Sequence, residues 1–121
     1  MEVSTERKEP VLIITIKGKL GAFFGVKELQ DALKEQLDDK INFILLDMKD
    51  VPYLSSSGIR ILLETRRKLR QKEGALVLFG LQPACHEILK VTGIIPELPV
   101  TATRAEAEQL VQPPDNQTSR Q

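Results

Sequence analysis

Three serines and a glycine stand together at residues 53–60, which read YLSSSGIR. They separate an apolar run, residues 41–48, from a stretch whose apolar residues recur at helical spacing. A helix that begins here would present free backbone N–H groups and the positive end of its dipole, which favour an anion. The simpler explanation is helix capping, because Ser55, Ser56 and Ser57 are all competent N-cap residues. Both interpretations stay open at this point.

Cys85 and His86 are the only cysteine and the only histidine of the chain. Neighbouring residues on a helix are roughly 100° apart around its axis, which is too divergent for a nucleophile and its base. Two such residues also cannot provide the three or four ligands of a zinc site, so we expect no metal. A packed thiol beside an exposed imidazole is the simpler interpretation, because cysteine is commonly buried.

No residue near the serines in the sequence is a clear catalytic base. Asp47 and Asp50 are the nearest candidates, and the sequence does not place either within reach of a hydroxyl. Gly18, Gly21 and Gly25 form no phosphate-binding fingerprint, because they lack a Gly-Lys-Ser/Thr ending and the spacing of dinucleotide sites. We therefore expect no enzymatic activity and no cofactor.

A cluster of basic residues follows the serines towards the end of the expected helix. Its members are Arg66, Arg67, Lys68, Arg70 and Lys72. Their favoured role is local, because cations complement the negative end of a helix dipole and no interleaved aromatic residues offer a stacking platform. We expect no nucleic-acid binding.

Phe23 and Phe24 fall in the expected loop between a strand and a helix, at the end of the sheet where the serine turn also emerges. An exposed aromatic ring at such a place could anchor a partner. Core packing is the alternative for either ring.

Composition limits the class of protein. A chain of 121 residues is expected to form one domain, and its 17 basic and 17 acidic side chains give no net charge that would favour nucleic acid or an anionic membrane. The first residues lack the profile of a signal peptide, and no apolar run approaches the roughly 20 residues of a membrane span. These observations, with a single cysteine, predict a cytoplasmic protein that does not insert into a membrane.

Strands and helices are expected to alternate around the serine turn. Residues 11–16, 41–48 and 75–79 are apolar runs that read as strands, and helical spacing begins at residues 26, 59 and 84. A capping-box pattern opens a last helix at Thr103. The pattern predicts an α/β domain with a mixed sheet of four to five strands and about four helices. Its first strands are expected to be antiparallel and the later ones joined by right-handed crossovers.

The domain is expected to cover residues 10–111, with order beginning at Pro10. Residues 1–9 are polar and form either a loose segment or an edge strand. Gly18 and Gly21, within residues 17–21, indicate a hairpin or a turn. Pro99 restricts residues 97–100 to a short edge strand, and residues 112–121 are predicted to be disordered. The predicted core contains Leu45, Leu46, Leu62, Leu76, Leu78 and Ile88.

Residues 44–59, which read ILLDMKDVPYLSSSGI, resemble the core of STAS domains, the module of anti-sigma factor antagonists. Members of this family typically carry aspartate, serine, serine and glycine at the end of this segment. The resemblance continues through GALVLF at 74–79 and through ILKVTGI at 88–94, which is similar to the leucine-threonine-glycine helix end of the family. The presence of these three segments in this order implies a single STAS-like domain.

The resemblance also implies a phosphoacceptor. In antagonists of this type the serine immediately before the glycine is phosphorylated by a kinase that is also an anti-sigma factor, and the kinase is bound only by the unphosphorylated form. Carried onto this chain, the acceptor is Ser57, with Ser56 as the alternative. Ser55, Ser56 and Gly58 would then face the partner, Gly58 by allowing close approach of its backbone. Ser55 and Gly21 stand where many members have aspartate.

Three functions follow as hypotheses. The first is a regulatory binding module of a bacterial partner-switching pathway, controlled by phosphorylation of Ser57. The second is a STAS subunit of another assembly, such as a stress-signalling or lipid-transport complex, in which the serine matters only structurally. The third is a small enzyme or nucleotide-binding protein that uses the helix start as an anion site. The sequence leaves the partner and a homodimer open.

Overall fold

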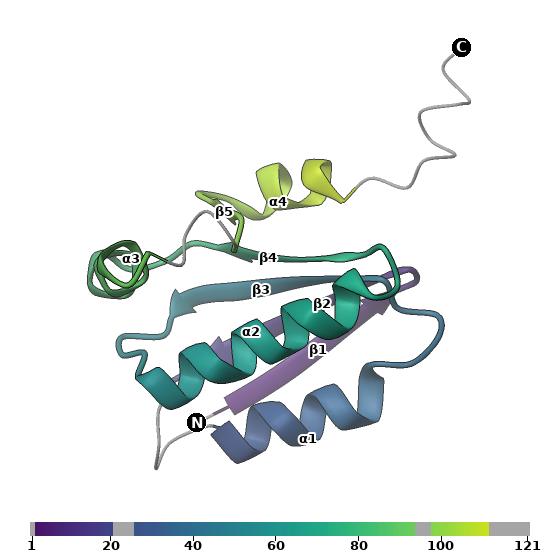
Figure 1. Cartoon of the computed structure of the whole chain (residues 1–121), viewed down its shortest axis with the longest axis horizontal. Helices are drawn as coiled ribbons and strands as arrows, with labels where there is room; N and C mark the ends of the chain where they lie inside the picture. Colours follow the sequence, from purple (N-terminus) through teal and green to yellow (C-terminus); the bar gives the residue numbers. More distant parts are fainter. Residues whose placement is uncertain (1, 21–25, 94–97, 112–121) are drawn as a thin grey trace.

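The computed structural model describes residues 2–20, 26–93 and 98–111, which form one sheet with helices on both faces (Figure 1). The strands are β1 (Glu2–Lys8), β2 (Val11–Lys17), β3 (Phe43–Asp50), β4 (Ala75–Phe79) and β5 (Val100–Thr101), and the described helices are α1 (Val26–Gln36), α2 (Ser56–Arg70), α3 (Pro83–Val91) and α4 (Arg104–Leu110). The sheet has the order β1-β2-β3-β4-β5, antiparallel between β1 and β2 and parallel elsewhere. This arrangement confirms the predicted mixed α/β sheet.

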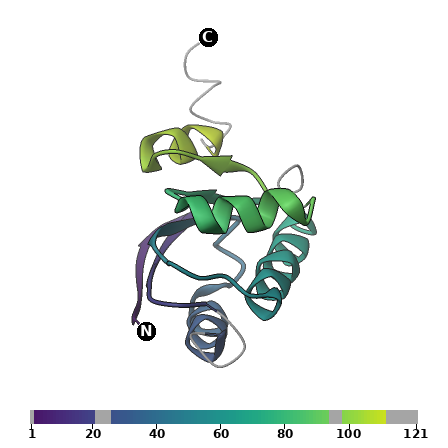
Figure 2. The ribbon, with the colours of Figure 1, turned by 90° about the vertical axis from the view of Figure 1, so that its left-hand side faces the viewer.

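The two faces of the sheet pack against different helices because side chains alternate along each strand. Ile44 and Leu46 of β3 belong to the core under α1, α2 and α3, whereas Leu45 lies in a second core with Ala107 and Val111 at α4. The two views show α1 and α2 on one side of the sheet and α4 on the other (Figures 1 and 2). None of the helices in the described part of the chain is long and apolar enough to cross a bilayer.

Five of the six predicted core residues are buried: Leu45, Leu46, Leu62, Leu76 and Leu78. The sixth prediction is corrected, because Ile88 is half-buried at the rim of the core. The inward stripe of α3 consists of Cys85 and Leu89, one turn apart, and Ile88 lies beside that stripe.

Order begins before Pro10, where the sequence was expected to start folding. Residues 2–8 form β1, which is the edge-strand alternative for this polar segment. Polar residues suit the position because β1 has a neighbour on one side only, and Val3 alone among its side chains is an apolar residue packed on the core. The β1–β2 hairpin turns at Glu9 and Pro10. A hairpin or a turn was expected at residues 17–21; the chain bends at Gly18 after the end of β2, and Gly21 lies outside the described residues.

The opposite edge of the sheet is short. Only Val100 and Thr101 form β5, and the carbonyl oxygen of Pro99 accepts a hydrogen bond from the Leu78 N–H at 3.0 Å. A proline tolerates this edge position because its missing N–H is not needed there. The predicted disorder of residues 112–121 falls outside the described residues and stays a prediction.

Candidate functional site at the serine turn

The turn between β3 and α2 carries the serines, and Leu20 holds its backbone in place. The Leu20 N–H donates to the carbonyl oxygen of Tyr53 at 2.9 Å, and the Leu20 carbonyl accepts from the Ser55 N–H at 3.0 Å. Leu20 and Leu54 also form an isolated parallel bridge, and both side chains are buried. The segment after β2 and the serine turn are therefore locked together by backbone bonds and apolar packing.

Ser55 is the N-cap of α2. Its backbone is extended, with φ −98° and ψ 175°, and its Oγ accepts a hydrogen bond from the Gly58 N–H at 3.4 Å. Its carbonyl oxygen accepts the first helical bond, from the Ile59 N–H at 2.9 Å. Of the three serines that could have capped the helix, the structure selects this one. The side chain of Ser55 is thus already engaged within the domain.

Ser56 and Ser57 are the first two residues of α2. Ser56 is exposed and Ser57 is half-buried, and neither hydroxyl has a hydrogen-bond partner among the residues that the structure describes. The first turn of the helix contains no acidic residue. The hydroxyls of Ser56 and Ser57 therefore remain available for modification.

Gly58 packs inside the domain, and its expected contact with a partner stays a prediction. It is buried, and a Cβ placed on it would lie 2.9 Å from the Leu20 carbonyl oxygen and 2.9 Å from Leu54 Cδ1. Contacts this short are closer than real Cβ atoms tolerate. The missing side chain thus makes room for the chain itself, and the glycine lets α2 pack closely against the segment after β2.

Asp47 and Asp50, the two candidate bases, make their hydrogen bonds to groups other than the serine hydroxyls. Asp47 is buried, and its carboxylate accepts from the Lys49 backbone N–H at 3.1 Å and from Lys49 Nζ at 3.2 Å. Asp50 is exposed at the end of β3, where its carbonyl accepts from the Gly18 N–H at 2.9 Å. The described residues around the turn thus show no base bonded to a serine hydroxyl, as an activated nucleophile would require.

Cys85 and His86 lie on α3 as the sequence indicated, the thiol buried and the imidazole exposed. The Cys85 thiol donates to the carbonyl oxygen of Val51 at 3.2 Å, which ties α3 to the start of the serine turn. Burial raises the pKa of the Cys85 thiol above its ordinary value. The described part of the chain contains no group of three or more side chains that could hold a metal ion.

Tyr53 is an exposed residue that the sequence analysis did not select. It is 47% exposed and directly precedes Leu54 and the serines. Its backbone is held by Leu20, so the ring projects from a fixed point of the turn. The sequence did contain a signal for this residue, namely an aromatic side chain in a turn next to three serine hydroxyls. The predicted anchors Phe23 and Phe24 lie outside the described residues.

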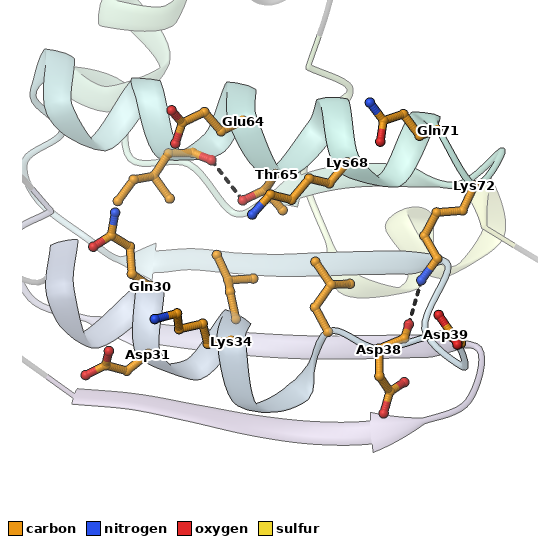
Figure 3. Close-up of a pocket in the computed structure, with 13 residues that line it drawn as sticks. Gln30, Asp31, Lys34, Asp38, Asp39, Glu64, Thr65, Lys68, Gln71 and Lys72 are labelled. Carbon is orange, nitrogen blue, oxygen red and sulfur yellow. Dashed lines mark hydrogen bonds between the residues drawn. The ribbon is translucent and has the colours of Figure 1, made fainter.

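The basic cluster at the end of α2 has at least one local role. Lys72 Nζ donates to the carbonyl oxygens of Asp38 at 2.5 Å and Ile41 at 2.6 Å, which joins the end of α2 to the connection between α1 and β3. Lys68 and Lys72 also line an open groove of about 740 Å³ between α1 and α2 (Figure 3). This groove runs along the part of α2 beyond the serine turn, and its lining contains none of the serines.

The comparison with known families covers most of the chain. The model of the STAS domain matches residues 2–107. The Bordetella bronchiseptica protein BtrV is 29% identical over 107 residues, which cover 88% of this chain and 91% of that protein. The anti-sigma-B factor antagonist of Listeria monocytogenes is 28% identical over 97 residues, covering 78% of this chain and 84% of the relative.

A solved structure supports the same architecture. The Bacillus cell fate determinant SpoIIAA, solved in its phosphorylated form, superposes with a TM-score of 0.70 at 19% identity. The match covers 89% of this chain and 97% of that one. At this identity the similarity shows the fold alone.

Proposed function

The chain belongs to the STAS domain family, and we propose that it acts as a regulatory binding module of the anti-sigma factor antagonist type, switched by phosphorylation of Ser57. Its partner in this proposal is a serine kinase that is also an anti-sigma factor. The observation that carries the proposal is the state of Ser57, which stands at the start of α2 with no hydrogen-bond partner in the described part of the chain. The module itself performs no chemistry.

The domain is suited to accept a phosphoryl group at this place. The kinase would transfer it from a nucleoside triphosphate: the Ser57 oxygen forms the new bond to phosphorus, the nucleoside diphosphate leaves, and the hydroxyl proton passes to a base of the kinase. The added charge of about −1.5 to −2 would meet no acidic side chain in the first turn of α2. Free N–H groups at the start of a helix favour such a charge. The fold should therefore survive modification without rearrangement.

A docked partner would not tolerate the same charge. Tyr53, Ser56 and Ser57 are exposed or half-buried on one turn, and a partner that packs over them would bury the phosphoryl group. Burying a phosphoryl dianion costs several kcal/mol in lost hydration, even when one cation lies beside it, and this cost is enough to release the partner. In this proposal Tyr53 is the aromatic anchor of the partner surface, together with the predicted Phe23 and Phe24.

A STAS subunit without a phospho-switch is the second candidate. It is favoured by Ser55, which stands where members of the family usually have aspartate and which is engaged as the N-cap of α2. A kinase that reads an aspartate at this position would lose that contact. In this alternative the serines shape the turn, and a partner binds regardless of phosphorylation.

Recovery of the partner from the native lysate tests the proposal. The unmodified protein and a Ser57→Ala variant are used as baits, the bound chains are identified by mass spectrometry, and the bait is then incubated with the partner and ATP. We expect both baits to capture a kinase-like protein and only the first to gain a phosphoryl group, mapped to Ser57. Phosphate on Ser56 alone would transfer the acceptor role to that residue, whereas capture without phosphorylation would support the second candidate.

A further inference from the structure

Arg60 lies one helical turn beyond the serines and is exposed on α2. Its side chain makes no hydrogen bond or ion pair within the described part of the chain that would give it a structural role. Arg7 is paired with Asp38 at 2.8 Å, and Arg104 is paired with Glu6 at 3.0 Å. The other arginines of α2, at positions 66, 67 and 70, are like Arg60 without such a partner in the described part of the chain. Arg60 differs from these arginines in its position, because it is the arginine of α2 nearest to the serines in the sequence.

The spacing brings this cation to the serines. Arg60 follows Ser57 by three residues and Ser56 by four, and residues at these separations are neighbours on a helix surface, with Cβ atoms about 5–6 Å apart. Side chains in a helix lean towards its N-terminus, so a long side chain at residue 60 covers the surface of the preceding turn. By this geometry we expect Arg60 to extend in the direction of the serine hydroxyls.

We propose that Arg60 is the internal counter-ion of the phosphorylated turn, and that its guanidinium group binds the phosphoryl oxygens on Ser57. Arginine matches phosphate geometrically, because its planar group donates two parallel hydrogen bonds. This inference rests on the proposed phosphorylation of Ser57 and adds the residue that receives the charge. Arg60 is a positioning residue: it holds the phosphoryl group on the surface of α2 and keeps it in the dianionic form.

Glu64 is the competing partner for Arg60, since it lies four residues further along α2. An arginine that precedes a glutamate by one turn has the less favourable orientation for a helical ion pair. No ion pair between these two side chains is present in the described part of the chain. A phosphoryl group with up to two negative charges therefore has the advantage over the single carboxylate.

The titration of phosphoserine tests this pairing without any partner protein. Phosphoserine is incorporated at position 57 during translation, and ³¹P NMR follows the second ionisation, whose pKa is ordinarily about 6. A nearby guanidinium lowers this pKa, and the worth of an exposed ion pair corresponds to about half a pH unit. We expect the pKa of phosphorylated Ser57 to rise by about that amount in Arg60→Gln and by less in Arg60→Lys.

Arg67→Gln is the matched control, because Arg67 is another exposed arginine of α2 ten residues beyond Ser57. Ten residues of helix span about 15 Å, which exceeds the screening length at physiological salt. Phosphoserine at position 57 of the Arg67→Gln protein should titrate as it does in the wild type. An Arg60→Gln protein that also titrates as the wild type overturns the inference. A shift on Arg60→Gln combined with unchanged partner affinity on phosphorylation would instead refute the proposed function and leave the pairing intact.

Discussion

Leu20 and Ser55 are joined by a backbone hydrogen bond of 3.0 Å, from the Ser55 N–H to the Leu20 carbonyl oxygen. The two residues are 35 positions apart in the sequence, and this bond fixes where α2 begins relative to the end of β2. The geometry of the serine turn therefore depends on a residue outside the serine motif. Perturbing the contact between these two segments should affect both stability and partner binding.

Gly58→Ala tests that contact. Alanine favours a helix over glycine by about 1 kcal/mol, but the new methyl group would lie 2.9 Å from the Leu20 carbonyl oxygen. Overpacking of this kind costs typically about 1–3 kcal/mol, so we expect a net loss of stability in urea unfolding. Ser56→Ala, on the exposed side of the same turn, is the control. A Gly58→Ala protein as stable as the wild type would show that the two segments separate easily.

Ser55→Ala removes the N-cap of α2. We expect a loss of about 0.5–1 kcal/mol, at the low end of the usual range because the capping bond to the Gly58 N–H is 3.4 Å long. Ser55→Asp should restore the cap and add a favourable charge at the positive end of the helix dipole. Chemical denaturation measures both. Equal stability of the serine and alanine proteins would mean that the long bond contributes nothing.

Arg7 donates to the carboxylate of Asp38 in the connection after α1, and we call this contact the arginine clamp. The clamp predicts that the free energy of unfolding depends on pH. The pKa of Asp38 lies below its ordinary value, first because the Lys40 backbone N–H donates to its carboxylate and then because Arg7 does, at 2.8 Å. A carboxyl group whose pKa is lowered on folding stabilises the fold above its unfolded pKa of about 4, and that contribution disappears as the pH falls through the folded value.

Asp38→Asn should therefore be less stable than the wild type at pH 6, and the gap should close as the pH falls below about 4. The midpoint of urea unfolding at several pH values measures the gap. Asp39→Asn, which changes the neighbouring exposed carboxylate, is the matched control and should show no such convergence. A gap between wild type and Asp38→Asn that is constant with pH would contradict the clamp.

The Cys85 thiol should resist labelling in the native protein. It is fully buried, it donates to the Val51 carbonyl at 3.2 Å, and burial raises its pKa, so little thiolate is present at neutral pH. We expect reaction with a thiol reagent to be slow in buffer and rapid in denaturant. Fast labelling of the folded protein would show that α3 opens readily from the start of the serine turn.

Much of the fold could be predicted because its signals are local. The apolar run that contains Leu45, the helical spacing that begins at Val26 and the capping box at Thr103 each correspond to an observed element. Residues 1–9 were left open between a loose segment and an edge strand, because the polar side chains of an edge strand such as β1 resemble those of a loose segment. Ile88 was placed too deep because helical spacing identifies a stripe but not its centre.

The site was only partly predictable for a related reason. The sequence placed three possible caps at the start of α2, but selection of Ser55 depends on its bond to Leu20, a contact between distant segments. The burial of Gly58 depends on the same segment, so the glycine could not be assigned to internal packing from its neighbours alone. Tyr53 is exposed on the turn, and the sequence alone does not predict which side chains of a turn face solvent.

The affinity of the recovered partner for the phosphorylated and unmodified protein is the most direct test of the account. Calorimetric titrations would compare the wild type, phosphoserine at position 57, Ser57→Ala and Ser57→Asp, with Ser56→Ala as control. We expect the wild type and both alanine variants to bind equally and Ser57→Asp to bind more weakly. Phosphorylation should weaken binding by at least about 100-fold, because removing the phosphoryl dianion from water costs several kcal/mol. Equal affinity of the phosphorylated and unmodified proteins would contradict the switch and leave Ser57 as a structural residue of the helix start.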